Sequence, residues 1–316
     1  MKILIIGIHG FVGSNLVAYL AKENEIYGLD IIAPEKVGVV KTYSWDDLDN
    51  GNVPEVDAII HLAGKAHDTK NQAAAETYFK VNRDLTIKIF DYFCARPKCK
   101  KFVFFSTAKA AADKVDGVLT EDIVPAPVGP YGESKIAAEQ YILSVMKDRP
   151  FEFEDRGVYI FRPCMIHGPG NKGNLNLLYN VVRKGSPWPL GAFENRRTFT
   201  SVENICFAVN GVISKDVPSG IYNMGDDEAL STNELIEEIC MSLGKKAHIW
   251  KLPKGLMNGV AKLGGWLHLP LNPERLRKLT ENYISSNEKI KKALGVEKMP
   301  VDARTGLQAT LKSFKG

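Results

Sequence analysis

The sequence is short of the features that mark secreted, zinc-binding and membrane-spanning proteins. Its five cysteines are odd in number and include no CxxC pair, which argues against a disulfide framework or a zinc site. No run of about 20 apolar residues occurs, so no spanning helix is expected. A strand-like run begins at Lys2 and leaves no room for a signal peptide. We therefore expect a cytoplasmic protein with reduced thiols and no metal.

Charge of one sign is also scarce. The 316 residues include 41 basic and 37 acidic side chains, a net charge of +4, and the basic runs are short. Nucleic-acid binding usually needs a concentrated basic stripe, so nucleic acid is not an expected partner. The fairly apolar stretch 256–271 is interrupted by Lys262 and His268. We expect it to pack inside the protein rather than against a membrane.

Strand-like and helix-like segments alternate through the first half of the chain. The strand-like segments are 2–7, 25–30, 37–43, 57–62, 101–107 and 158–162. The helix-like segments are 11–23, 73–94 and 131–146. Such alternation predicts an α/β fold, in which helices cover both faces of a doubly wound parallel sheet.

The pattern changes after Pro163. Glycine, asparagine and proline become dense over 167–191, around a helix at 175–184, and 199–213 indicates a return to the main sheet with Ser201 as a helix cap. From about residue 221 the chain contains helices and short strands without the earlier alternation. We predict one unit over 1–166, to which the chain returns at about 198–214, and a smaller carboxy-terminal α/β lobe over 167–316.

A glycine turn joins the first strand to the first helix. Gly7, Gly10 and Gly13 allow a tight turn, a close approach of a pyrophosphate, and close packing of helix on strand. The helix amino terminus then offers free N–H groups to the phosphates. Asp30 closes the second strand, where its carboxylate can accept hydrogen bonds from an adenosine ribose. It would repel a 2′-phosphate, and the two isoleucines that follow it supply no basic partner, which favours NAD over NADP.

One tyrosine stands out among the eleven. Only Tyr131 has a lysine four residues later, and this spacing places Tyr131 and Lys135 on one face of a helix. A nearby ammonium, together with the positive nicotinamide ring, lowers the pKa of a tyrosine and makes it a usable base. Thr107 ends a strand, where the ligand crevice of a parallel sheet lies. Its hydroxyl is placed to hydrogen-bond the reacting oxygen of a substrate.

Together these pieces resemble the extended short-chain dehydrogenase/reductase family, particularly the NAD-dependent nucleotide-sugar epimerases and dehydratases. The matching pieces are the turn Gly7 to Gly13, Asp30, His61-Leu62-Ala63-Gly64, Asn82, Ser106-Thr107, Tyr131-Gly132-Glu133-Ser134-Lys135, Arg162-Pro163 and His167-Gly168-Pro169-Gly170. The resemblance implies a Rossmann-like NAD-binding domain over 1–166 and a nucleotide-sugar lobe over 167–316.

The resemblance also implies roles for individual residues. It makes Thr107, Tyr131 and Lys135 catalytic. The residues implied to bind the cofactor are Gly7, Gly10, Phe11, Val12, Gly13, Asp30, Ile31, Leu62, Ala63, Gly64, Asn82, Ser106, Tyr131, Lys135 and Pro163. Those implied to contact the substrate are Lys65, Thr107, Ala108, Asn174, Leu190, Arg197 and Lys278, with Arg277 beside Lys278.

Two differences from the family's pattern limit the reactions that we expect of this chain. The usual Val-Tyr-Gly after the Thr107 strand is Ala110-Ala111-Ala112 here, so the loop over the substrate differs. In 4,6-dehydratases an Asp-Glu pair follows the threonine and eliminates water from the sugar. Ala108 and Lys109 occupy those positions in this chain, so dehydration is not expected.

The segments 173–176, 187–191 and 195–197 are similar to the substrate lobe of UDP-sugar epimerases. They are more similar to a bacterial polysaccharide subgroup of C4 epimerases and 4-keto-sugar reductases. We expect an NAD-dependent C4 epimerase of a UDP-hexose or UDP-N-acetylhexosamine that works through a 4-keto intermediate. The alternatives are an NAD(P)H-dependent 4-ketoreductase of a UDP-4-keto-6-deoxy-N-acetylhexosamine and a non-catalytic dinucleotide sensor. The resemblance also implies a homodimer, with helices 73–94 and 131–146 as candidates for its interface.

Overall fold

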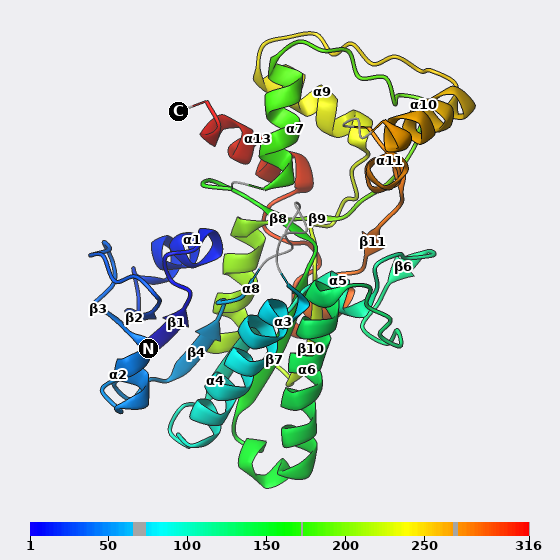
Figure 1. Ribbon diagram of the computed structural model, residues 1–316. Coiled ribbons are helices and arrows are strands. Elements are labelled where there is room, and N and C mark those ends of the chain that lie inside the picture. Colours follow the sequence, from blue (N-terminus) through cyan, green and yellow to red (C-terminus); the bar gives the residue numbers. More distant parts are fainter. Residues whose placement is uncertain (66–73, 172, 268–270, 316) are drawn as a thin grey trace.

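The computed structural model describes residues 1–65, 74–171, 173–267 and 271–315, and its centre is a seven-stranded parallel sheet (Figure 1). The strand order is β10-β7-β5-β4-β1-β2-β3. The strands are β1 (Lys2–Ile6), β2 (Glu25–Leu29), β3 (Lys41–Tyr43), β4 (Ala58–His61), β5 (Lys101–Phe105), β7 (Gly157–Pro163) and β10 (Gly220–Met224). Apolar side chains in β1 alternate between the two faces of the sheet and so build two cores.

Helices cover both faces, as the alternation predicts. Ile3 and Ile5 pack into a core with α1 (Phe11–Leu20), α8 (Val202–Ser214) and α12 (Glu288–Leu294). Leu4 and Ile6 pack into the opposite core. The helices on that side are α2 (Trp45–Asp49), α4 (Leu85–Cys94), α6 (Pro130–Asp148) and η2 (Pro150–Phe153). The doubly wound, Rossmann-like α/β fold is therefore confirmed.

The sheet contains one strand more than the sequence analysis predicted. β10 pairs in parallel with β7 at the sheet edge, although the chain from about residue 221 showed no strand–helix alternation. Within the stretch 199–213, β9 (Phe199–Ser201) pairs with β8 (Met165–His167) outside the main sheet, and only α8 packs on that sheet. Ser201 caps α8 by accepting a hydrogen bond from the Asn204 N–H. The domain boundary at residue 166 stays a prediction.

The helix predicted over 73–94 is three elements instead of one. They are α3 (Ala75–Tyr78), the π-helix η1 (Phe79–Asp84) and α4, while Ala73 lies outside the described residues. A π-helix turn adds one residue between hydrogen-bonded partners and rotates the side chains that follow it, and such turns often occur at functional sites. Here η1 carries Asn82, a predicted cofactor residue.

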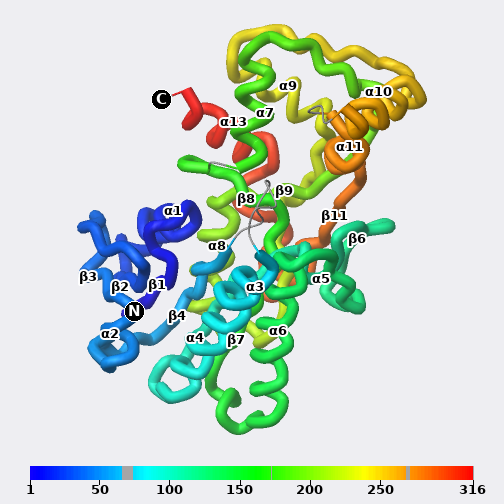
Figure 2. The backbone as a smooth tube through the Cα atoms, viewed as in Figure 1, coloured from blue at the N-terminus to red at the C-terminus, as the bar shows by residue number. Residues whose placement is uncertain are grey.

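The carboxy-terminal part forms a second lobe, seen in the upper part of Figure 2. Its helices are α7 (Asn174–Arg183), α9 (Thr232–Ser242), α10 (Lys254–Trp266), α11 (Pro273–Thr280) and α13 (Ala303–Ser313). Apolar clusters hold α7, α9 and α13 together, and α10 with α11. The short elements β6 (Val118–Leu119), β11 (Ile284–Ser285) and α5 (Ala108–Ala111) lie between the lobe and the sheet.

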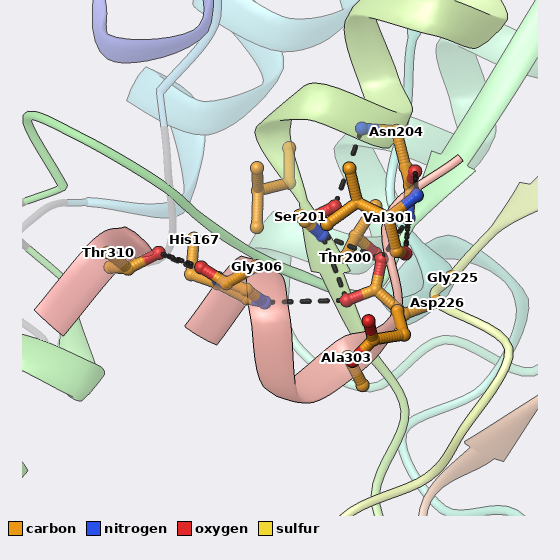
Figure 3. Close-up of polar contacts among 12 residues, drawn as sticks. His167, Thr200, Ser201, Asn204, Gly225, Asp226, Val301, Ala303, Gly306 and Thr310 are labelled. Atoms are coloured by element: carbon orange, nitrogen blue, oxygen red, sulfur yellow. Dashed lines mark hydrogen bonds and ion pairs between the residues drawn. The ribbon is translucent and has the colours of Figure 1, made fainter. Parts of the chain in front are cut away.

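A buried polar network ties this lobe to the sheet (Figure 3). Asp226, which follows β10, is 3% exposed, and its carboxylate accepts hydrogen bonds from the Ser201 N–H at 2.9 Å and from Asn204 Nδ2 at 2.8 Å. His167 Nε2 lies 3.4 Å from Asp226 Oδ2, and its Nδ1 lies 2.9 Å from Thr310 Oγ1 on α13. One carboxylate therefore connects β8, β9, α8, β10 and α13.

No helix in the described part of the chain is long and apolar enough to cross a membrane. Those same residues contain no group of three or more His, Cys, Asp or Glu side chains that could hold a metal ion. All five cysteines are free thiols. The cytoplasmic location stays a prediction.

The network around Asp226 generates a stability prediction. Replacing Asp226→Ala leaves the Ser201 N–H buried without its acceptor and removes one of the two acceptors of Asn204 Nδ2, which keeps the Val301 carbonyl. The free energy of unfolding should therefore fall by about 2–4 kcal/mol. Asp116 is a matched control because its side chain is 93% exposed, and Asp116→Ala should change that free energy by less than about 0.5 kcal/mol. Urea unfolding followed by circular dichroism measures both. Equal losses in the two variants would contradict a special role for Asp226.

Candidate active site

The carboxyl ends of four neighbouring strands bring the predicted site residues to one edge of the sheet. β1 leads into Gly7, β4 into Leu62, β5 into Ser106 and Thr107, and β7 ends at Pro163. In an open parallel sheet, ligands bind in the crevice outside these ends. The fold therefore gathers residues from distant parts of the sequence into one region.

The glycine turn has the geometry that a pyrophosphate requires. Gly7 has a φ of +84°, and a Cβ there would lie 2.9 Å from the Ala63 nitrogen. A Cβ on Gly13 would lie 2.5 Å from the Gly7 oxygen, so both positions exclude a side chain. Gly10 caps α1 without a side chain, which leaves the first-turn N–H groups of α1 open to an anion. These residues fit a dinucleotide.

Asp30 lies beside this turn, at the end of β2. One carboxylate oxygen accepts a hydrogen bond from the His9 N–H at 3.0 Å and the other from the Ile31 N–H at 2.8 Å. Each oxygen keeps a second lone pair for a ribose hydroxyl. Lys36, which the sequence analysis missed, donates to Ser14 Oγ at 2.7 Å and to the Ile8 carbonyl at 3.2 Å. Burial lowers the pKa of Lys36, and Asp30 opposes that shift.

Tyr131 and Thr107 are hydrogen-bonded to each other through their side chains. Burial raises the pKa of Tyr131, and the Thr107 hydroxyl lowers it. The ring of Tyr78 packs edge-on against that of Tyr131, with 6.4 Å between the centroids. Thr107 itself is 7% exposed and caps α5 by accepting from the Lys109 N–H at 3.3 Å. A phenol and a second hydroxyl thus lie together at the strand end.

The ammonium of Lys135 is buried beneath the same crevice. Its Nζ donates to the Phe105 carbonyl at 2.7 Å, and the side chain is almost fully covered. Burial lowers the pKa of Lys135 to about 8, and Glu139, one turn further along α6, raises it. A Cβ on Gly64 would lie 3.0 Å from this Nζ, so the glycine lets the loop after β4 pass close to the ammonium.

Asn82 joins that loop to α6. It is fully buried on η1, where its Oδ1 accepts from the Lys65 N–H at 2.7 Å and its Nδ2 donates to the Lys65 carbonyl at 3.1 Å. The same Nδ2 donates to Ser134 Oγ at 3.0 Å. Lys65 extends over the ring of Tyr78, with its Nζ 5.6 Å from the centroid. Asn82 therefore fixes the backbone of the loop. Ser134 belongs to the motif 131–135 and here holds Asn82, whereas Tyr78 is a neighbour of Tyr131 that the sequence did not indicate.

Ser106 is hydrogen-bonded to a buried ion pair below the crevice, which Arg162 and Glu139 form. Its hydroxyl donates to Glu139, whose carboxylate also accepts from Arg162 Nε at 3.0 Å and Nη2 at 2.5 Å. Arg162 and Glu139 are 1% and 0% exposed. The Ser106 side chain points to Glu139 and so helps to position β5 against α6, and its predicted contact with the cofactor stays a prediction. Glu139 carries no local sequence signal, because its partner is 23 residues away.

His61 ends β4 and is fully buried. Its Nε2 lies 3.0 Å from Thr86 Oγ1, and burial followed by the charge of Lys135 lowers its pKa to about 3. The ring is therefore neutral at physiological pH. Because the ring is fully covered and contacts Thr86, its position indicates a structural role in the packing of β4 against α4.

Four of the predicted substrate residues fall into two groups, which are apolar side chains that are buried and polar side chains that are exposed or hydrogen-bonded. Ala108 and Leu190 are buried in apolar clusters, and Leu190 packs with Met257, Ala261 and Leu276. They shape the lobe. Asn174 is exposed and opens α7, and the Arg197 guanidinium donates to the Lys278 carbonyl.

Arg277, rather than Lys278, faces the Thr107 side of the lobe. Lys278 Nζ pairs with Glu274 one turn back along α11, at 2.7 Å. Arg277 Nη2 lies 3.5 Å from Asp113, which also accepts from Lys109 Nζ at 2.9 Å. Burial raises the pKa of Asp113, but Lys109 and Arg277 together hold it below its ordinary value. Arg277 therefore contacts the segment that follows Thr107 and α5, whereas Lys278 pairs within α11.

A family model and several known proteins are similar to this chain, and they belong to the same family. Residues 3–225 match the model of the "NAD dependent epimerase/dehydratase family". A UDP-glucose 4-epimerase of Vibrio cholerae is 28% identical over 271 residues, which is 80% of this chain and 78% of that protein. The N-acetyl-alpha-D-glucosaminyl-diphospho-ditrans,octacis-undecaprenol 4-epimerase of Escherichia coli is 27% identical over 298 residues, which is 92% of this chain and 85% of that protein.

The fold also has solved counterparts. The UDP-glucuronic acid 4-epimerase of Bacillus cereus, solved in complex with NAD, superposes with a TM-score of 0.75 at 20% identity. The match covers 100% of this chain and 99% of that one. The chain therefore belongs to the NAD-dependent epimerase/dehydratase family, it is an NAD-dependent enzyme of the extended short-chain dehydrogenase/reductase type, and NAD is its cofactor.

Proposed function

We propose that the protein is a C4 epimerase of a UDP-hexose or UDP-N-acetylhexosamine. The observation that carries this proposal is the hydrogen-bonded pair of Tyr131 and Thr107, with the buried ammonium of Lys135 on the same helix, one turn further along α6. A phenol needs a neighbouring positive charge to act as a base near neutral pH, because its free pKa is about 10. Lys135 supplies a fixed charge on the same helix face.

The reaction needs the side chains of Tyr131 and Thr107, the charge of Lys135 and the cofactor. NAD, when bound, supplies the acceptor and donor of the hydride at C4. Tyr131 Oη takes the proton of the C4 hydroxyl as that carbon is oxidised to a ketone, and returns it when the ketone is reduced from its other face. Thr107 donates a hydrogen bond to the reacting oxygen. No redox equivalent is consumed, since the hydride that leaves C4 returns to it.

Cations of the second lobe would hold the diphosphate. Arg197 and Arg277 present planar donor forks, which match a diphosphate better than a lysine does. Arg197 already donates to a backbone carbonyl of α11, so the two arginines lie on adjoining segments. We assign the family's second phosphate contact to Arg277 in place of Lys278, because the guanidinium of Arg277 is a planar donor fork. Both side chains are ion-paired here, Arg277 with Asp113 and Glu281 and Lys278 with Glu274. Asn174 stays a predicted contact on the phosphate side.

The names of the relatives support a reaction at C4, but they do not identify the sugar that this protein converts. One relative is named for UDP-glucose, and another for N-acetylglucosamine linked through a diphosphate to undecaprenol. Both act at carbon 4 by name. Dehydration is disfavoured because Ala108 is apolar and the Lys109 ammonium is held by Asp113, so neither residue offers the acid and base that elimination of water needs.

The Tyr131→Phe variant tests the catalytic assignment. Losing the phenol should lower kcat by about 10²–10⁴-fold, because general acid–base catalysis is removed while the ring still packs on Tyr78. Tyr19→Phe is the matched control, since Tyr19 is an exposed tyrosine of α1, and should keep full turnover. Steady-state kinetics with a UDP-sugar measures both. Full turnover by Tyr131→Phe would remove the central assignment.

Turnover without added cofactor separates the epimerase from the 4-ketoreductase. An epimerase regenerates its bound NAD in each cycle, so it should convert UDP-glucose or UDP-N-acetylglucosamine to the galacto isomer with no cofactor added. Chromatography of the products gives the outcome. Absence of conversion, combined with stoichiometric NADH consumption on a UDP-4-keto-6-deoxy-N-acetylhexosamine, would replace epimerisation by reduction.

We also propose a homodimer in which α4 and α6 of two chains form a four-helix bundle. The two helices pack side by side on one face of the sheet, so both present an outer surface to a partner. Light scattering on the purified full-length chain should give the mass of two chains. The mass of one chain at micromolar concentration would contradict the dimer.

A further inference from the structure

Exposed apolar side chains concentrate on one short part of the second lobe. The large hydrophobic residues exposed within 250–267 are Trp250, Leu256, Val260, Leu263, Trp266 and Leu267. Trp266 is 77% exposed, although a side chain of this size is usually well covered. An apolar group of this extent on a surface marks a binding face more often than chance exposure.

Most of these side chains share one face of α10. Leu256, Val260, Leu263 and Leu267 follow each other at spacings of four, three and four residues, which confines them to roughly 60° of the helix circumference. The inward face is also apolar, because Met257, Ala261 and Gly264 are buried. Of the stretch 256–271, which was expected to pack inside the protein, the inward face of α10 does so and the outer face is exposed, while residues 268–270 lie outside the described residues.

The chain segment that contains this face is basic, although the neighbouring helix α11 carries the exposed Glu274. No aspartate or glutamate occurs between Glu238 and Glu274, whereas the interval contains five lysines. They are Lys245, Lys246, Lys251, Lys254 and Lys262, all exposed. None of the five forms an ion pair with an acidic residue in the described part of the chain. Lys245 and Lys246 lie beside α7 and α9, where Lys245 Nζ donates to the Arg183 carbonyl at 2.8 Å, and Lys254 Nζ lies 5.7 Å from the centroid of the Phe193 ring. The positive charge of this segment is therefore not neutralised by acidic side chains of the described residues and can attract an anionic partner.

This combination fits an anionic lipid surface. A helix with leucines and tryptophan on its outer face and lysines around them lies in the interface of a bilayer, with the apolar side chains inserted and the ammonium groups on the headgroups. Tryptophan favours that interface because its ring is amphipathic. A second copy of this chain is a poorer occupant, since a symmetric contact would place the same five lysines against each other.

We propose that α10 is an interfacial helix that docks the protein on an anionic lipid bilayer. The helix lies at the outer edge of the second lobe, away from the main sheet, so a flat surface can reach it (Figures 1 and 2). Its inward face packs on Leu190 and Leu276, which are close in sequence to Arg197 and Arg277. Docking therefore brings the substrate lobe to the membrane. The inference does not depend on which sugar the enzyme converts.

Vesicle sedimentation with the full-length protein tests the docking. Wild type should bind phosphatidylcholine vesicles that contain phosphatidylglycerol, and high salt should weaken that binding. The double variant Leu263→Glu/Trp266→Glu should bind at least tenfold more weakly, and Lys254→Ala/Lys262→Ala should also bind more weakly. Leu177→Glu on the exposed side of α7 is the matched control and should bind as wild type does.

Three results would overturn the proposal. The first is no binding to phosphatidylcholine vesicles, whether or not they contain phosphatidylglycerol. The second is binding that is equally strong with and without phosphatidylglycerol. The third is full binding by the Leu263→Glu/Trp266→Glu variant. Light scattering on the same variant detects the rival occupant, because a change from dimer to monomer would assign the face to a second copy. Since these side chains are exposed, turnover of a UDP-sugar in solution should be unchanged, which separates failure of docking from failure of the proposed function.

Discussion

The buried ammonium of Lys135 is the constraint on which the rest of the site depends. Removing a charge from water is costly unless it is paired and hydrogen-bonded, and here the Phe105 carbonyl at the end of β5 accepts from it. Glu139, one turn along α6, adds a compensating negative charge and is itself held by Arg162 and Ser106. Strands β5 and β7 and helix α6 are therefore fixed against one another by a chain of charges beneath the crevice.

This arrangement sets the position of the side chains that we propose to be catalytic. With Lys135 fixed, Tyr131 lies one turn earlier on α6, where Thr107 reaches its hydroxyl and the ring of Tyr78 packs on it. Gly64 leaves room for the loop after β4 to pass over the ammonium, and Asn82 holds that loop by its backbone. The cofactor side of the crevice is then completed by the glycine turn, whose close contacts tolerate no side chain at Gly7 or Gly13.

Local patterns made the sheet, the glycine turn and the Tyr131–Lys135 spacing predictable, because each depends on neighbouring residues. What depends on distant partners was not predictable. β10 joins the sheet only because β7 offers a free edge, and Asn82 lies on a π-helix turn that no composition signal marks. Lys278 stays a predicted substrate contact, and the ion pair of its neighbour Arg277 with Asp113 could not be predicted because Asp113 is distant in sequence. The outer face of α10 looked like core because apolar spacing alone does not distinguish burial from exposure.

The central claim is that fixed positive charge converts a buried phenol into a usable base. Ultraviolet difference titration of phenolate formation, in wild type minus Tyr131→Phe, measures the pKa of Tyr131 with and without NAD. Burial raises this pKa in the protein alone, and we expect the added positive charge of the nicotinamide ring to bring it down towards neutrality. A Tyr131 pKa that stays above that of a free tyrosine with NAD bound would contradict the account.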